Sequence, residues 1–391
     1  MSSNPKKAIY LDNAAATPID KAVKDEMFEF SNSFYGNPSS FNEKGREARD
    51  RIEKARAFVA KFIGARPDEV IFTSSGSEAN NLAILGSLGS DQPGEAVVMS
   101  IEHPSVLEAY KVLRDRGWKI SHIKVDENGL ISLEDLESKL SARVKSVSVM
   151  YANNEIGTIE PIKKISKVIS NFRNKKIFPL LHVDACQATE YLGMNVNNLG
   201  VDLMTFNGSK IYGPRGIGVL YARRGVKINP QIVGGDQEGG RRAGTENAPA
   251  IVGMAKALSL IDRKEGERLS RLRDYFIENI QKVIPGIKIN GALGKNRLPN
   301  NINISISGLS SEILLLELDK YGIYAGSGSA CTARSVEPSH VLRAIGNESK
   351  YLEGALRFSL GRGTNKNDLN YVFKILPQIV LNLKKRLQYR I

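Results

Sequence analysis

Short apolar runs alternate with segments of helical periodicity through the first half of the chain. Residues 42–63 place apolar side chains at three- and four-residue intervals, and Gly64 follows, which predicts a helix that ends there. Two further helices are expected over 77–89 and 104–117. Strands are expected where short apolar runs occur, at 69–75, 96–100, 120–125, 144–152, 178–185, 202–208 and 216–223.

Most of these expected strands are continuously apolar rather than apolar at every second position. A strand of that kind is buried on both faces, as in a mainly parallel sheet covered by helices on both sides. The first half of the chain therefore predicts an α/β fold.

The pattern changes from residue 248 onward. Residues 248–284 turn helical and highly charged. A smaller α+β region follows, with strands expected at 301–306 and 356–360 and helices at 311–322 and near 366–387. We therefore expect two domains: a large one over residues 15–260, and a small α+β one made of residues 1–14 and 261–391.

Composition places the chain among ordinary globular proteins. Hydrophobic residues make up 41% and charged residues 25% of its 391 residues. No apolar run approaches the ~18 residues of a membrane helix, and the N-terminus MSSNPKKAIYLDN lacks the apolar region of a signal peptide. These features predict a cytoplasmic protein.

Its two cysteines, Cys186 and Cys331, form no C-x-x-C motif, and its four histidines show no metal-ligand spacing, so no metal site is expected.

The net charge of +13 raises the question of acidic partners. Basic residues are scattered, with modest clusters at 173–176 and 384–386, and no aromatic residues interleave with them in an RNA-binding pattern. Acidic protein partners or transient tRNA contact therefore fit better than nucleic acid as a direct ligand.

Lys210, in FNGSKIYGPRG, directly follows an expected apolar strand. A lone lysine in that place is usually a surface residue. Asp184, in HVDACQA, ends another such strand, where a carboxylate is unfavourable unless it meets a cation. Pyridoxal phosphate would supply one, because its protonated ring nitrogen needs a carboxylate and its aldehyde needs a lysine amine. The pair indicates a pyridoxal-phosphate site.

Three further segments could complete such a site. TSSGSEANN (73–81) is a turn between a strand and a helix, and its backbone N–H groups suit a phosphate. His103 directly follows a strand; alone it would more often be a cap or a core histidine, but here it could stack on the ring and move protons. Asn153 and Asn154 lie at a strand end, where an amide could bond the ring hydroxyl.

An ordered set of motifs across nearly the whole chain resembles a known family. They are LDNAAATP (11–18), GNPSS (36–40), SSGSEANNLAI (74–84), EHPSV (102–106), NNEIGTIEPI (153–162), HVDACQA (182–188), DLMTFNGSKIYGPRGIG (202–218), GGRRAGTEN (239–247), SGSACTARSVEPSHVLRAIG (327–346) and LRFSLGR (356–362). The chain resembles the cysteine desulfurases of the iron–sulfur-cluster assembly type, in the class V aminotransferase-like group of pyridoxal-phosphate enzymes. The resemblance implies the fold-type-I architecture: a mainly parallel seven-stranded sheet between helices, plus a smaller α+β domain.

The resemblance also implies roles for the residues at matching positions. Lys210 would bind the cofactor covalently, and Asp184 would pair with its ring nitrogen. The ring oxygen would be held by Gln187 and Asn154, and the phosphate by Gly76, Ser77, Asn207 and Ser209. Thr245 would reach the phosphate of a partner subunit, which implies a homodimer.

The implied reaction removes sulfur from L-cysteine, giving L-alanine and a persulfide on Cys331. Arg357 would bind the substrate carboxylate, and His103 would assist proton movement. The persulfide sulfur would pass to acceptor proteins for iron–sulfur-cluster assembly or tRNA thiolation. Two alternatives share the fold, a selenocysteine lyase and a class V aminotransferase, although an aminotransferase needs no thiol on a loop. A catalytically idle scaffold would be expected to lose Lys210, Asp184 or Cys331, and all three are present.

Four positions depart from the family pattern. Asp236 stands where the family commonly has glycine after a GG pair, which places a carboxylate near the phosphate region. Ser209 stands where the family usually has histidine, and Asn207 where it usually has serine. Both replacements can still donate hydrogen bonds to a phosphate. Cys186 lies where the family often has a small or apolar residue. The strand that precedes Cys186 could end just before it, so its direction is open, and we expect it to be buried as a small hydrophobic residue.

Overall fold

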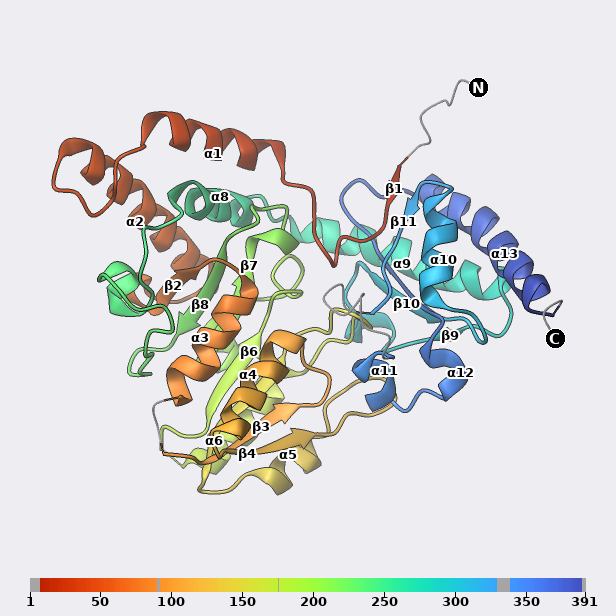
Figure 1. Ribbon diagram of the computed structural model, residues 1–391, viewed down its shortest axis with the longest axis horizontal. Coiled ribbons are helices and arrows are strands. Elements are labelled where there is room, and N and C mark those ends of the chain that lie inside the picture. The colour runs from red at the N-terminus through yellow and green to blue at the C-terminus, as the bar shows by residue number, and fades with distance from the viewer. Residues whose placement is uncertain (1–7, 90–91, 175, 329–337, 389–391) are drawn as a thin grey trace.

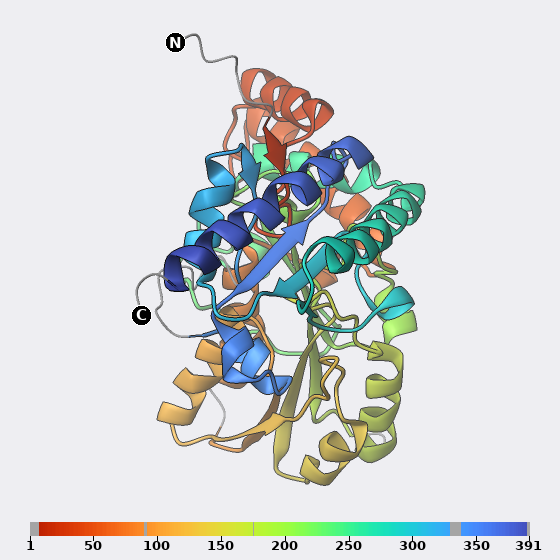
Figure 2. The same cartoon turned by 90° about the vertical axis from the view of Figure 1, so that its right-hand side faces the viewer.

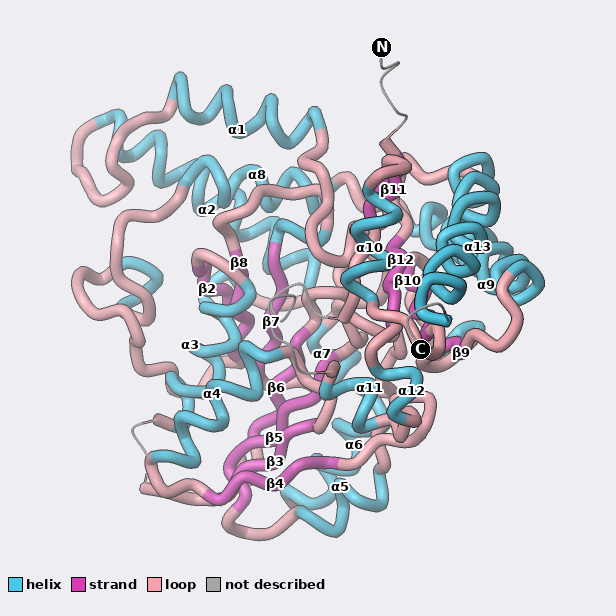
Figure 3. The backbone as a smooth tube through the Cα atoms, turned by 45° about the vertical axis from the view of Figure 1, so that its right-hand side comes forward, coloured by secondary structure: helices cyan, strands magenta, loops and turns pink. Residues whose placement is uncertain are grey.

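A seven-stranded sheet forms the centre of the larger part of the molecule in the computed structural model, which describes residues 8–89, 92–174, 176–328 and 338–388. The strands lie in the order β2–β8–β7–β6–β5–β3–β4 (Figure 3). They are Val70–Thr73 (β2), Glu95–Met99 (β3), Lys119–Ile123 (β4), Val144–Met150 (β5), Leu180–Asp184 (β6), Leu203–Asn207 (β7) and Gly218–Ala222 (β8). Strand β8 runs antiparallel to both of its neighbours, β2 and β7, and the other neighbouring pairs are parallel. The predicted α/β fold with a mainly parallel seven-stranded sheet is confirmed.

Helices cover both faces of this sheet, as the continuously apolar strands require (Figure 1). On β3, Ala96 and Val98 pack with helices α3 (Gly76–Leu88) and α4 (Pro104–Asp115). Val97 and Met99 point to the other face and join the core formed with helices α2 (Glu43–Ile63), α6 (Ile162–Arg173) and α8 (Ala248–Ser259). The remaining helices of this part are α1 (Lys21–Ser33), α5 (Leu133–Lys139) and α7 (Val196–Leu199).

Local capping explains where the predicted helices begin and end. Asn42 caps α2 by accepting a hydrogen bond from the Gly45 N–H group. Gly64 ends the helix with φ of 70°, a left-handed conformation that favours glycine. The charged stretch 248–284 is divided into α8 and α9 (Arg263–Val283), and Asp262 caps the second helix.

A smaller set of strands and helices packs beside the large sheet (Figure 1). Strands β9 (Lys288–Ile289), β10 (Asn301–Ser305) and β12 (Ala355–Ser359) form an antiparallel sheet in the order β12–β10–β9. Strand β1 (Ile9–Tyr10) pairs in parallel with β11 (Ile323–Tyr324), so the N-terminal strand joins this part of the molecule. Short helices α11 (His340–Ala344) and α12 (Ser349–Leu352) precede β12. The expected domain boundaries stay a prediction.

Helices α9 and α13 (Lys366–Gln388) lie together over this smaller sheet, with α10 (Ser311–Asp319) beside α13 (Figure 2). The Phe276 ring packs 5.0 Å from that of Phe358 and 5.2 Å from that of Phe373, which joins the two helices to β12. Of the helices within the described ranges, none is both long and apolar enough to cross a membrane.

Candidate active site

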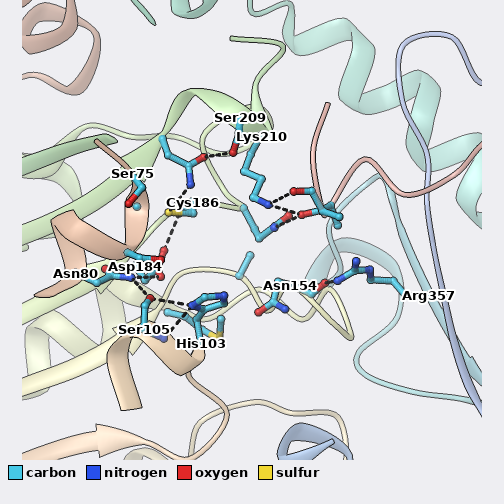
Figure 4. A pocket seen from close by; sticks show the side chains of 18 residues that line it. Ser75, Asn80, His103, Ser105, Asn154, Asp184, Cys186, Ser209, Lys210 and Arg357 are labelled. Atoms are coloured by element: carbon cyan, nitrogen blue, oxygen red, sulfur yellow. Dashed lines mark hydrogen bonds between the residues drawn. The ribbon is translucent and has the colours of Figure 1, made fainter. Parts of the chain in front are cut away.

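Polar residues that follow several strands of the large sheet meet at one edge, because the carboxyl ends of parallel strands lie together. They surround a cavity of about 230 Å³ (Figure 4). A water molecule takes up about 30 Å³ in the liquid, so the cavity has room for a small organic molecule. Of the twelve residues that the sequence predicted to form the site, ten line this cavity: Gly76, Ser77, His103, Asn154, Asp184, Gln187, Asn207, Ser209, Lys210 and Arg357.

The Lys210 amine is held at one wall of the pocket (Figure 4). Lys210 lies in a single helical turn, Gly208–Lys210, directly after β7. Its Nζ donates a hydrogen bond to the Ala14 carbonyl at 2.8 Å and another to the Ala15 carbonyl. The N-terminal segment thus places two backbone acceptors around an amine that faces the cavity.

Asp184, the last residue of β6, is buried on another wall. Its carboxylate accepts hydrogen bonds from Asn80 Nδ2 at 2.8 Å and from the Cys186 N–H group at 2.9 Å. Within the part of the chain that the structure describes, no basic side chain forms an ion pair with Asp184. A buried carboxylate without a cation is unfavourable, so this wall suits a positively charged group of a ligand.

The first turn of α3 faces the pocket beside Asp184. Ser75 caps the helix by accepting a hydrogen bond from the Glu78 N–H group. The N–H groups of Gly76 and Ser77 belong to the same first turn, where the helix supplies no acceptor of its own. Both residues line the cavity, so this 13-residue helix presents its positive end to a bound anion.

His103 is the N-cap of α4, as one of the two alternatives from the sequence had it, and it also lines the pocket. Its Nδ1 accepts a hydrogen bond from the Ser105 N–H group at 3.1 Å. That bond leaves the proton of a neutral imidazole on Nε2. The ring is therefore fixed in direction by the helix start.

Arg357 reaches the pocket from β12 and is 1% exposed. Its guanidinium forms an ion pair with Asp12 at 2.8 Å and donates to the Asn154 carbonyl at 3.0 Å. Among the described residues, its buried Nε has no hydrogen-bond partner. One donor of a buried guanidinium therefore remains for an acceptor in the pocket.

Cys186 is only partly buried, and it lines the pocket instead of packing in the core as we expected. Strand β6 ends at Asp184, so strand alternation does not set the direction of Cys186. Burial within the protein, together with the nearby Asp184 carboxylate, raises the pKa of its thiol well above the usual range. Cys186 is thus a neutral thiol near pH 7.

Two predicted residues do not line this pocket. Thr245 borders a separate cavity together with Gly216 and Asn247. Cys331 lies outside the described residues. Of the described residues near that segment, Ser339 donates a hydrogen bond from Oγ to Glu155 Oε2 at 2.6 Å, and Glu155 directly follows the pocket residue Asn154.

Several residues that contact the predicted site residues were not predicted from the sequence. Asn80 lies one helical turn after Gly76, and this spacing could have pointed to the pocket. Ser105 contacts both Asn80 and His103. No local pattern marked Asp12 as the partner of Arg357, because the two residues are far apart in the chain.

Comparisons with known proteins agree with this fold. Residues 9–372 match the family model described as Aminotransferase class-V. The chain belongs to this family. It is 45% identical to cysteine desulfurase IscS of Dictyoglomus turgidum over 391 residues, which covers 98% of each chain. It is 41% identical to a cysteine desulfurase of a Nostoc species over 380 residues, covering 96% of this chain and 94% of the relative. The resemblance to the cysteine desulfurases is confirmed.

Solved structures show the same similarity. A NifS-like protein aligns with a TM-score of 0.88 at 34% identity, covering 95% of this chain and 99% of that one. SspA in complex with cysteine aligns with a TM-score of 0.80 at 31% identity, covering 90% of this chain and 98% of that one. The apo cysteine desulfurase of Thermococcus onnurineus aligns with a TM-score of 0.85 at 25% identity, covering 96% of this chain and 95% of that one.

Proposed function

We propose that this chain is a pyridoxal-phosphate-dependent cysteine desulfurase that converts L-cysteine to L-alanine and retains the sulfur as a persulfide on Cys331. The observation that carries the proposal is the presence, in one pocket, of the Lys210 amine and of the buried Asp184 carboxylate, for which the described residues supply no cationic partner. The similarity to named cysteine desulfurases over nearly the full chain supports it.

The described residues fit the cofactor at each of its polar groups. Lys210 would bind the aldehyde, and Asp184 would pair with the protonated ring nitrogen. Asn154 and Gln187 would hold the ring oxygen, and the first turn of α3, together with Asn207 and Ser209, would hold the phosphate. A Cβ atom at Gly76 would lie 2.8 Å from Asn207 Nδ2, so glycine at this position keeps the space beside the helix end open.

When bound, pyridoxal phosphate supplies an electron sink that stabilises negative charge on the substrate. Arg357 would bind the substrate carboxylate through its remaining donor. Lys210 would take the α-proton as a base, and His103 would donate or accept a proton through Nε2.

The Cys331 thiolate would then attack the sulfur of the bound cysteine. An S–S bond forms as the C–S bond of the substrate breaks. The electron pair of the broken bond leaves with the three-carbon fragment, which is protonated and released as alanine.

The persulfide would pass to acceptor proteins for iron–sulfur-cluster assembly or tRNA thiolation, and the net charge of +13 favours acidic acceptors. We place this reaction in the cytoplasm.

Incubation of the purified, cofactor-loaded protein with L-cysteine is expected to produce alanine and a persulfide. Amino-acid analysis measures alanine, and mass spectrometry of peptides reports which cysteine has gained a sulfur atom. The same incubation with L-alanine in place of L-cysteine is the control for background. Transfer of the amino group to an oxo acid, without alanine or persulfide, would instead indicate an aminotransferase.

We also propose a homodimer in which Thr245 completes the partner's site. Thr245 does not line the pocket of its own chain. Its neighbour Glu246 lines a groove of about 840 Å³ that also contains Phe41, whose side chain is 90% exposed. Val233 is 79% exposed on the segment that leads to Thr245. Burial of these apolar side chains would favour a second copy on this face.

Thr245→Ala is expected to weaken cofactor retention about 10- to 100-fold, the range for loss of a hydrogen bond to a charged group. Equilibrium dialysis against buffer without cofactor measures the retention. Because Thr245 would act across the dimer, a hybrid of one Thr245→Ala chain and one Lys210→Ala chain should regain one complete site. Hybrids can be purified through two different affinity tags. A hybrid that retains no more cofactor than its parents, or a monomer with full retention, would contradict the shared site.

A further inference from the structure

A hydrogen bond between Ser339 and Glu155 joins the start of α11 to the turn that follows β5. The Ser339 Oγ donates to Glu155 Oε2 at 2.6 Å. The same oxygen caps α11, because it accepts hydrogen bonds from the N–H groups of Val341 at 3.1 Å and of Leu342 at 3.3 Å. Both acceptor positions of the hydroxyl are thus used, and its single proton is left for Glu155. The start of the helix therefore sets the direction of this bond.

Glu155 is a buried acceptor whose backbone is fixed, and its residue is 1% exposed. Its N–H group donates to Asn153 Oδ1 at 2.8 Å. Its carbonyl accepts hydrogen bonds from the side-chain amides of Asn301 at 3.2 Å and of Asn303 at 3.1 Å. Since Glu155 directly follows the pocket residue Asn154, its carboxylate is held at the edge of the pocket.

The same carboxylate borders the chain shortly before Cys331. A Cβ atom at Gly328 would lie 3.0 Å from Glu155 Oε2, so the backbone passes directly beside this oxygen. Two positions earlier, Gly326 exchanges two backbone hydrogen bonds with Arg357, at 2.9 and 2.6 Å. The chain that leads to Cys331 is therefore held beside Arg357 and Glu155.

Chain length limits how far Cys331 can lie from this point. Cys331 follows Gly328 by three positions, and three extended residues span at most about 11 Å. After Cys331 the chain contacts the same carboxylate again, through Ser339. One carboxylate thus contacts the chain both before and after the proposed nucleophile.

The residue after Ser339 makes a second contact with a turn of the large sheet. His340 Nε2 donates to the Glu102 carbonyl at 2.9 Å. The donor must be the imidazole, because a carbonyl can only accept. Glu102 directly precedes the pocket residue His103. Two consecutive residues at the start of α11 are therefore bonded to turns that carry pocket residues.

We propose that Glu155 and Ser339 are positioning residues for the sulfur transfer. The Glu155 carboxylate holds the chain on both sides of Cys331, beside Gly328 and through Ser339, and so sets where the thiol can reach the substrate sulfur. The inference rests on the proposed function, which supplies the attack by Cys331. It goes further by assigning the placement of that attack to two residues that do not line the pocket.

The test separates the thiol attack from the chemistry that does not need a thiol. Single-turnover formation of the Cys331 persulfide by the cofactor-loaded protein, measured by rapid quenching and mass spectrometry, reports the attack. Exchange of the α-hydrogen of L-alanine for deuterium in D2O uses the cofactor and Lys210 but no thiol. A positioning role predicts a change in the first rate alone, whereas general damage to the fold lowers both.

Glu155→Ala and Ser339→Ala should each lower the rate of persulfide formation about 10- to 100-fold, because a displacement of about 1 Å between reacting groups can cost that much. Alanine exchange should remain at the wild-type rate in both variants. Ser339→Thr keeps the hydroxyl and should restore persulfide formation. Ser132→Ala removes the N-cap hydroxyl of α5; it is the matched control and should leave both rates unchanged.

The double variant tests whether the two residues act through their shared bond. If they do, Ser339→Ala should have no further effect in a Glu155→Ala background. Independent losses in the double variant, or parallel losses of persulfide formation and alanine exchange, would overturn the positioning role. If Glu155→Ala does not fold, as judged by circular dichroism, Ser339→Ala and its rescue by Ser339→Thr give the same test.

The two assays also distinguish failure of this inference from failure of the proposed function. Wild-type protein that fails in either assay would overturn the proposed function, and this inference with it. Wild-type activity in both assays, together with unchanged persulfide formation in the Glu155 and Ser339 variants, would overturn the inference alone.

Discussion

Lys210→Ala is expected to abolish the visible absorbance of the purified protein and the formation of alanine from cysteine. Lys210 is the lysine whose amine faces the pocket from the end of β7, so its removal leaves the cofactor aldehyde without its covalent partner. Loss of such a group is expected to lower activity by on the order of 10³-fold or more. Absorbance spectra and alanine assays measure the two effects.

Borohydride reduction gives the same prediction an independent readout. Reduction of the wild-type holoenzyme should fix the cofactor to the peptide that contains Lys210, as seen by mass spectrometry. Lys227→Ala is a matched control, because Lys227 is an exposed lysine that follows β8, the strand of opposite direction. A variant without Lys210 that keeps its visible band would refute the assigned role.

Cys331→Ala is expected to keep the cofactor and its absorbance but to lose alanine formation by on the order of 10³-fold or more. Cys186→Ala should instead keep alanine formation within about 3-fold of the wild type. The reason lies in the ionisation of Cys186: its neighbours raise the pKa of the thiol well above the usual range, and only a thiolate is an effective nucleophile. Alanine assays on the two variants compare the cysteines directly.

Peptide mass spectrometry after incubation with cysteine adds a second measurement. The persulfide is expected on Cys331 and not on Cys186 in the wild type, and on neither cysteine in Cys331→Ala. The opposite outcome, in which Cys331→Ala remains active and Cys186→Ala is inactive, would mean that the nucleophile has been assigned to the wrong residue.

Much of the fold could be predicted because its signals are local. Apolar runs and helical spacing predicted the strands of the large sheet, and the stop at Gly64 was predicted from glycine's tolerance of a left-handed backbone. The expected strand ends identified Asp184 and Lys210 as a pair, since a carboxylate at the end of a buried strand is unfavourable without a cation and pyridoxal phosphate requires both a carboxylate and a lysine amine. Three of the pocket's contacts had no such signal: the carbonyls of Ala14 and Ala15, which accept from Lys210, and the Asp12 carboxylate beside Arg357.

The sequence by itself determined the periodicity of the elements, their caps, and the residue types that a pyridoxal-phosphate site requires. Each of these depends on neighbours within a few positions along the chain, where hydrogen bonds and side-chain spacing are set locally. The tertiary structure decided that Cys186 lines the pocket beside Asn207, and that Thr245 lines a separate cavity of its own chain. These outcomes depend on strand order and on packing between distant segments, where many weak contacts act together and no single residue pattern records the result.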